Sequence, residues 1–429
     1  MKEEILTFIW RNKLFPQKLT SIEGKNIQII DFGQPSVDSG PDFINVKLII
    51  DDKLWIGSVE MHVKASDWYK HKHDTDLGYK NVILHIVLEA DISIYRSTGE
   101  LIPTVQYNPS EEFIKRYKNL ISKNDIIKCN KYLHLVPSLI TLNYLDSLFL
   151  ERLQQKAENI LQTYHSYFQD WEQVIFINIA KYLGSRINSF PMELLAKSLS
   201  IRMLRRYTDN IEILEAILFG VAGFLDEEIN DKYLKKLREI FGVYKVKHNL
   251  KRINRDIWKF MRMRPSSFPT IRIAQLAMLI SKTDQFFSLF LEKKLQDIRT
   301  IFRVSTSQYW QDHYIFGKLT SKKIKNIGES MINNLLLNAV VPVIFAYALY
   351  FNDKTLNNRA IEYLTSLKFE KNYITRRFQA IQIKNNNASH SQALIHLYKN
   401  YCLRLKCLEC RIGTYLLNKS GELNPSAFV

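Results

Sequence analysis

Three side chains that can bind a metal ion or transfer a proton stand at alternate positions of one short segment: Glu60, His62 and Lys64. The segment around them, LWIGSVEMHV at 54–63, has the alternation of a β-strand. Because a strand has a period of two, the three side chains share one face. That face could hold a divalent cation, although the same pattern is also typical of a strand whose polar face is only solvated.

A further carboxylate, Asp42, precedes the neighbouring predicted strand at 43–50. It follows Gly40 and Pro41, which disfavour an ordinary entry into a strand. Two carboxylates that meet at a strand junction bind Mg²⁺ or Mn²⁺ and leave coordination positions for a phosphate group and water. The sequence therefore predicts a metal site at Asp42 and Glu60.

The histidines near this site have several possible roles. An imidazole at His62 suits a softer ion than Mg²⁺, or acts as a base near neutral pH. His71 and His73 lie in the polar segment SDWYKHKHDTD at 66–76, where we expect surface histidines more than ligands. His85 lies inside an apolar run and is expected to be a hydrogen-bonded core histidine.

The elements that would position these residues follow from periodicity. Residues 2–14 have helical spacing, and Asp51 with Asp52 favours a tight hairpin between two strands. Beyond about residue 110 the pattern changes to long helical segments. We predict an α+β protein with a mixed sheet domain at 1–110, a linker at 111–137 and a basic all-α domain at 138–429. Predicted strands cover 26–33, 43–50, 54–63, 81–91 and part of 92–107; predicted helices cover 111–123, 142–165, 211–225, 271–281, 332–351 and 390–417.

This order of elements, with an acid entering the second strand and Glu-x-His on the third, resembles the PD-(D/E)XK nuclease core. The resemblance implies a restriction-endonuclease-like sheet in which Asp42 and Glu60 hold Mg²⁺ or Mn²⁺. His62 occupies the position that is usually lysine, so Lys64 would supply the amine. A first-helix glutamate often completes the metal shell in such nucleases; Glu4 or Glu3 could fill that role, and the helical phase favours Glu4.

Most of the chain is also similar to a bacterial family known as domain of unknown function 2851. The similarity rests on DSGPDF, VEMHVKASDWYKHKHD and NVILHIV in the first part, on RPSSFPTIRIAQLA and YWQDHYIFGK in the middle, and on SQALIHLYKNYCLRLKCLECRIG near the end. It implies an architecture more than a chemistry.

All four cysteines belong to one candidate set. Cys402, Cys407 and Cys410 form C-x₄-C-x₂-C, and Cys129 follows the predicted sheet domain. Four thiolates suffice for a tetrahedral Zn²⁺ ion or a [4Fe–4S] cluster. The alternative is that CLRLKCLEC is an amphipathic helix whose thiols fill space in a packed core.

The formal net charge is +17, and it is unevenly distributed. Residues 1–100 contain 12 Lys and Arg against 15 Asp and Glu, whereas the rest contains 48 against 28. Lys and Arg bind polyanions by releasing phosphate counterions, although a lysine-rich composition also raises the charge without any ligand. DNA is the expected partner, and the candidate contacts are Lys251, Arg252, Arg255, Arg262, Arg264 and Arg272, near Trp258 and Phe260 for base stacking.

Composition excludes several other classes. We find no apolar run of about 20 residues and no signal peptide, so we expect a cytoplasmic protein without membrane contact. No Gly-x₄-Gly-Lys-Ser/Thr loop is present, so a motor activity would need a partner. Two functions remain. One is a metal-dependent endo- or exodeoxyribonuclease; the other is a non-catalytic nucleic-acid-binding or scaffold protein with a degenerate nuclease core.

Overall fold

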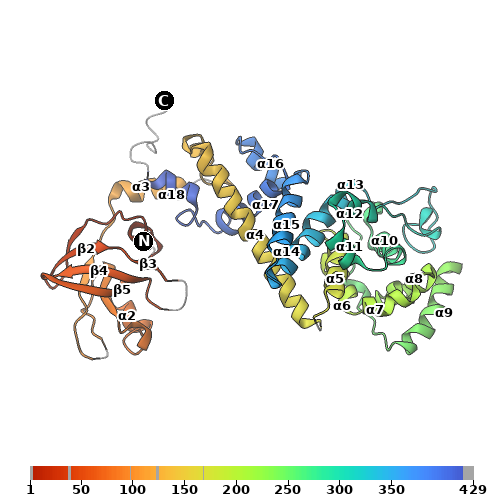
Figure 1. The fold of residues 1–429 in the computed structure, drawn as a ribbon, viewed down its shortest axis with the longest axis horizontal. Helices are drawn as coiled ribbons and strands as arrows, with labels where there is room; N and C mark the ends of the chain where they lie inside the picture. The colour runs from red at the N-terminus through yellow and green to blue at the C-terminus, as the bar shows by residue number, and fades with distance from the viewer. Residues whose placement is uncertain (1–2, 37–39, 97, 122–124, 168, 419–429) are drawn as a thin grey trace. The chain divides into compact units, whose positions relative to one another are not determined.

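The computed structural model of the chain describes residues 3–418 except 37–39, 97, 122–124 and 168. It divides into two compact units, one from 1–144 with 397–429 and one from 145–396 (Figure 1). The chain is α+β, with a mixed sheet near its N-terminus followed by a large helical part, as the sequence predicts. The segment after residue 396, which the sequence analysis assigned to the helical domain, groups instead with the unit that contains the sheet.

The sheet has seven strands in the order β1-β2-β4-β5-β6-β7, with β3 paired to β4. The pairs from β1 to β5 are antiparallel, and β5–β6 and β6–β7 are parallel. The strands are β1 Lys18–Thr20, β2 Asn26–Asp31, β3 Gln34–Pro35, β4 Phe43–Ile50, β5 Lys53–Lys64, β6 Val82–Glu89 and β7 Thr104–Gln106.

The β4–β5 hairpin forms at the predicted place. Asp51 and Asp52 have φ of 45° and 64°, and Ile50 pairs with Lys53 across the turn. Both turn residues are left-handed, as a two-residue hairpin of type I′ requires, and aspartate tolerates that conformation. The next strand, β6, is buried along nearly its whole length because it lies between two parallel neighbours.

Helices α1, α2, α3 and α18 belong to the first unit, and α4 begins in it. The bounds in the first unit are α1 Glu4–Arg11, α2 Asp67–Lys70, α3 Glu111–Ile121 and α18 Arg411–Asn418. The others are α4 Ser138–Ser166, α5 Trp171–Leu183, α6 Ser189–Lys197, α7 Ile201–Leu204, α8 Ile211–Val221, α9 Lys232–Lys247, α10 Pro269–Lys282, α11 Phe286–Glu292, α12 Leu295–Ile301, α13 Glu329–Leu335, α14 Val341–Tyr350, α15 Lys354–Ser366, α16 Tyr373–Ala380 and α17 Ala388–His396.

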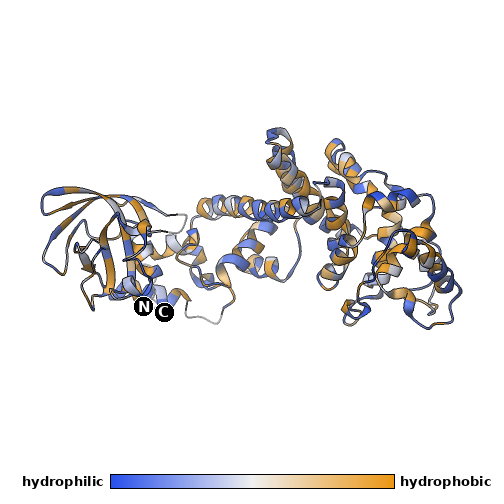
Figure 2. Cartoon of the chain, turned by 90° about the horizontal axis from the view of Figure 1, so that it is seen from below, coloured by the Kyte–Doolittle hydropathy of each residue, from blue (hydrophilic) through white to orange (hydrophobic). Residues whose placement is uncertain are grey.

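The core of the helical unit is built from helices that are apolar nearly all round. Helices α5, α8 and α14 bury most of their side chains, and Figure 2 shows hydrophobic residues along the helices of this unit. The stretch Glu329–Tyr350 is, contrary to the sequence analysis, long and apolar enough to cross a membrane. However, 78% of its most apolar window is buried inside the protein, as in a core helix.

One carboxyl group is enclosed in this core. Glu215 on α8 accepts hydrogen bonds from the Tyr233 hydroxyl at 2.8 Å and from Trp310 Nε1 at 2.9 Å. Burial raises the pKa of Glu215 from 4.5 to about 7. A raised pKa means that this group favours folding below pH 4.5, and that its contribution is lost as the pH rises through 7.

We therefore expect Glu215→Gln to become more stable relative to the wild type as pH rises from 4.5 to 8. The gain is up to about 3 kcal/mol, because each pKa unit corresponds to about 1.4 kcal/mol. Urea unfolding at several pH values measures it. Glu212→Gln, on the same helix but paired with Lys236 near the surface, is the control and should show no such slope. A flat difference for Glu215→Gln would contradict the argument.

Candidate metal centre

Asp42 and Glu60 lie side by side. Asp42 directly precedes β4, and Glu60 lies on β5, the strand that pairs with β4. The Asp42 backbone N–H donates to Glu60 Oε2 at 3.0 Å, and the Met61 backbone N–H donates to Asp42 Oδ2 at 3.0 Å. Glu60 thus accepts a hydrogen bond from the backbone of Asp42, and Asp42 accepts one from the residue that follows Glu60. This reciprocal pair fixes both carboxylates next to each other, and Glu60 is only 6% exposed.

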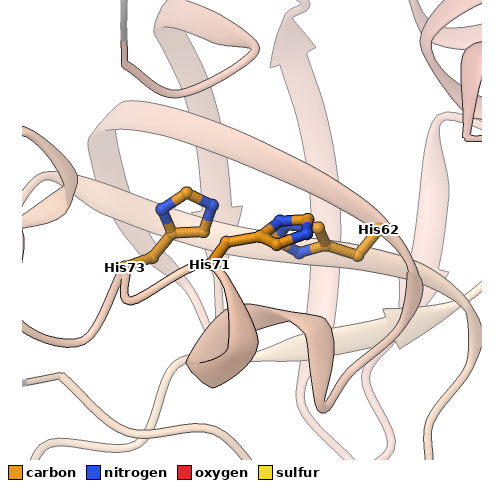
Figure 3. A group of neighbouring side chains, drawn as sticks. All are labelled: His62, His71 and His73. Atoms are coloured by element: carbon orange, nitrogen blue, oxygen red, sulfur yellow. The ribbon is translucent and has the colours of Figure 1, made fainter.

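Three imidazoles form a group beside Glu60, two of them close to its carboxylate. The ligand nitrogens of His62, His71 and His73 all lie within 4.8 Å of one another (Figure 3). His71 Nδ1 is 3.2 Å from His62 Nε2. Glu60 Oε1 is 3.6 Å from His62 Nε2 and 3.5 Å from His73 Nε2. The candidate centre therefore has three nitrogen donors and one carboxylate at its edge.

The chain reverses to bring His71 and His73 back to the strand. Asp67 Oδ2 accepts the Lys64 backbone N–H at 3.1 Å, which starts the short helix α2 directly after β5. His71 follows the end of that helix, and Lys72 has φ of 63°, which turns the chain. The His73 backbone N–H then donates to the Trp68 carbonyl at 3.0 Å. These contacts direct His71 and His73 toward the buried part of β5.

The distances fit a single ion. Zn²⁺ binds imidazole nitrogen at about 2.0–2.1 Å, so two ligand atoms at tetrahedral positions are about 3.4 Å apart. The three short separations, 3.2, 3.5 and 3.6 Å, are close to that value. Imidazole-rich sites favour Zn²⁺, Mn²⁺ and similar ions over Mg²⁺, which takes oxygen ligands.

The electrostatics of the site favour a bound cation. Burial and then the neighbouring Asp42 raise the pKa of Glu60 to about 9. Burial raises the pKa of Asp42 to about 6, against the lowering effects of the Met61 N–H and Arg11. Burial, His73 and His71 lower the pKa of His62 to about 3. His62 is therefore neutral at pH 7, which is the form that binds metal ions, and a cation would offset the cost of the buried carboxylates.

The glutamate of the first helix that approaches the pair is Glu3, and Glu4 is exposed. Burial, then Asp42 and Asp67, raise the pKa of Glu3 to about 7. The helical phase favoured Glu4, but Glu3 precedes the first helical residue and does not follow that phase. Both glutamates line a cavity of about 560 Å³ that also reaches Asp42. Four basic side chains line the same cavity: Arg11, Lys118, Arg404 and Lys406.

Lys64 does not join the buried group. Its ammonium pairs with Glu89 of β6 at 3.0 Å, and its side chain is 48% exposed. Although the strand period puts it on the same face as Glu60 and His62, it stands where β5 ends at the surface. The structure thus supplies no amine from Lys64 near the carboxylate pair.

His85 orients His62 from the neighbouring strand. Its Nε2 is 2.8 Å from His62 Nδ1, and Glu60 pairs with His85 in the parallel register. If His62 Nδ1 donates this bond, its Nε2 keeps a lone pair directed at His71 and His73. The sequence analysis expected a hydrogen-bonded core histidine here, and the structure confirms it.

We expect His85→Leu to weaken binding of Mn²⁺ about 10- to 100-fold, because loss of a partner behind a ligand frees its ring orientation. His85→Gln offers an amide oxygen to His62 Nδ1 and should retain most of the affinity. Calorimetric titration of both variants at pH 7.5 measures the effect. Unchanged affinity in His85→Leu would show that His62 needs no such support.

The six basic residues predicted to bind DNA differ in exposure. Lys251, Arg262 and Arg264 are exposed, and Arg252 is exposed but pairs with Asp226 at 2.9 Å. Arg255 is half-buried, pairs with Glu227 at 2.9 Å and stacks on Phe224.

Two further residues of that prediction lie inside the helical unit. Arg272 is 8% exposed and donates to Gln275 Oε1 at 2.8 Å, so it is not available to a surface ligand. Trp258 is buried, and its Nε1 donates to the Ala222 carbonyl, so it cannot stack on a base. The basic and apolar pattern of these segments therefore did not show which side chains face the core and which could bind DNA.

The four cysteines converge. Cys129, Cys402, Cys407 and Cys410 all line one small cavity in the first unit, and no disulfide joins them in the described part of the chain.

The chain is thus an α+β protein with a candidate metal centre. The centre consists of a buried carboxylate pair on the mixed sheet and a group of three histidines beside it. A model of the family described as protein of unknown function (DUF2851) matches residues 3–373, and the chain belongs to this family. The match includes every residue of the candidate metal centre and ends before the last three cysteines. No curated protein and no solved structure is similar enough to the chain to be matched.

Proposed function

We propose that this protein is a metal-dependent nuclease that hydrolyses DNA phosphodiester bonds. The observation that supports this most directly is that Glu60, which accepts a hydrogen bond from Asp42, lies 3.6 Å from His62 and 3.5 Å from His73, two members of the group of three imidazoles. Carboxylates and imidazoles together suit Mn²⁺. His62, His71 and His73, with Glu60 at their edge, would hold such an ion.

When bound, the ion would supply Lewis-acid activation of a phosphate group and of water. Asp42, which lies beside Glu60 and lines the adjoining cavity, would accept the proton of the attacking water. The cavity beside Asp42, with Arg11 and Arg404 in its wall, would receive the charged phosphodiester. No lysine is needed in this scheme.

The basic composition beyond residue 100 supports DNA as the substrate. Exposed Lys251, Arg262 and Arg264 offer phosphate contacts on the helical unit. Contacts of this kind release counterions, so binding should weaken steeply as salt rises, independently of the metal centre.

The test uses the full chain, freed of metal and then given Mn²⁺, Mg²⁺ or Zn²⁺, with supercoiled, linear and single-stranded DNA. We expect Mn²⁺ to support cleavage best, EDTA to stop it, and added Zn²⁺ to inhibit it. DNA binding that is salt-sensitive but never leads to cleavage would favour a non-catalytic nucleic-acid-binding protein with a degenerate core. Absence of both would overturn the proposal.

A further inference from the structure

All four cysteines of the chain meet at one place, although they come from two distant segments. Cys129 lies just before the 3₁₀ helix Asn130–Leu135, and the other three lie between the π-helix Leu397–Cys402 and α18. One cavity is lined by all four thiols. Both segments belong to the first unit.

The backbone leaves the helical path where these thiols converge. The sequence predicts one helix over 390–417, but residues 403–410 form turns, and Leu405 has φ of 54°. A Cβ on Gly413 would lie 2.1 Å from the Cys407 carbonyl oxygen, so the turn closes against a position that only glycine fits. Space-filling cysteines on an amphipathic helix would need neither the break nor this close approach.

Polar groups are directed at one of the sulfurs. The backbone N–H groups of Ile412 and Gly413 and the Tyr144 hydroxyl interact with Cys410 and lower its pKa against the raising effect of burial. The Tyr144 hydroxyl is buried and has no partner of ordinary hydrogen-bond geometry among the described residues. Donors that converge on a buried sulfur stabilise a thiolate, which is the form that binds metals.

The remaining thiols are buried together. Burial and the neighbouring sulfurs raise the pKa of Cys129 and of Cys402, and burial raises the pKa of Cys407 to about 11. Lys128 and Lys406 line the same cavity, and Lys128 lowers the pKa of Cys407, so positive charge already faces the group.

We propose that Cys129, Cys402, Cys407 and Cys410 bind one thiophilic metal centre through four thiolates. The shared chemistry admits a Zn²⁺ ion or a [4Fe–4S] cluster, and since no three of these described sulfurs lie within 4.8 Å of one another, they would have to move closer together to hold Zn²⁺. The centre would close a loop of the chain between residues 129 and 402 and hold the turn at 403–410 in place. That turn also forms part of the wall of the cavity beside Asp42, through Arg404 and Lys406.

Full-length protein purified without oxygen from cells supplied with zinc and iron provides the direct test. We expect either about one thiol-bound zinc per chain, counted as the zinc that a His71→Ala variant retains, or about four iron and four sulfide per chain with visible absorption. Cys129→Ser should lower that content to below about a tenth of the wild-type value. His71→Ala is the matched control, because it removes a ligand of the other candidate centre and should leave the thiol-bound metal in place.

If the Cys129→Ser variant fails to fold, a second measurement on the wild type tests the same inference. In the wild type, a mercurial reagent that blocks thiols should release the metal in proportion to the thiols modified, and EDTA-treated protein should expose four reactive thiols. Four freely reactive thiols in the untreated protein, with neither zinc nor iron–sulfur present, would overturn the inference, and so would a disulfide within the set.

The outcome is separable from that of the proposed nuclease, because metal content is measured without DNA. Only the consequence for activity rests on the proposed function. If the nuclease proposal holds, loss of the thiol-bound centre should loosen the turn that carries Arg404 and raise the KM for DNA with a smaller effect on kcat. A thiol centre in a protein that cleaves nothing would leave this inference intact.

Discussion

Replacing Glu60 by Gln is expected to lower Mn²⁺-dependent DNA cleavage by about 10³-fold, because the charge that holds the ion beside the scissile phosphate is removed. The amide is nearly isosteric, and its oxygen can still accept the Asp42 backbone N–H, so the backbone at the junction should not move. Single-turnover cleavage of a labelled duplex at saturating protein measures the effect separately from DNA binding.

Stability distinguishes this loss from unfolding. Burial and Asp42 raise the pKa of Glu60, so the metal-free protein bears a cost for that carboxyl group near neutral pH. Glu60→Gln removes the cost, and the metal-free variant should melt at the same temperature as the wild type or higher. Glu89→Gln, which breaks only the exposed pair with Lys64, is the control and should keep its activity. Cleavage by Glu60→Gln within about tenfold of wild type would exclude Glu60 as a ligand.

Substituting both His71 and His73 by alanine is expected to lower the affinity for Mn²⁺ by at least about 100-fold, because two of the three nitrogen donors disappear. Each single variant should lose less than the double. Competition with a fluorescent chelator gives the dissociation constants without any assay of activity. DNA binding at low salt should persist, since it depends on the basic residues of the helical unit.

His165→Ala is the matched control for the histidine variants. His165 is exposed on α4 and contacts Tyr164 and Tyr350, away from the carboxylate pair in the sequence and in a different unit. Its removal should leave Mn²⁺ affinity unchanged. Equal affinity in the wild type and in the double variant would mean that the three imidazoles are a packing cluster, and the metal would then have to rest on Asp42 and Glu60 alone.

Local patterns in the sequence determined much of the secondary structure around the candidate site. The alternation in residues 54–63 placed Glu60 and His62 on one face, and Asp51 with Asp52 specified the hairpin because aspartate accepts left-handed φ. Strand and helix periods depend on neighbours within a few residues, so a single sequence carries them. The α+β class followed from the same local signals, whereas the family followed from the resemblance of longer motifs.

Tertiary structure alone decided which side chains meet. His71 and His73 had the composition of surface residues, and only the reversal at Lys72 turns them toward His62. Their spacing, His-x-His directly after a strand that carries Glu and His, was the one signal that could have found them.

The sequence pattern likewise did not determine which of these side chains are buried. Glu3 and not Glu4 approaches Asp42, Arg272 lies inside a helical core, and the predicted helix at 390–417 opens so that thiols from residues 129 and 402–410 share one cavity. Each of these depends on contacts between segments far apart in the chain. Local propensity does not distinguish between such alternatives, whereas packing and desolvation select one of them.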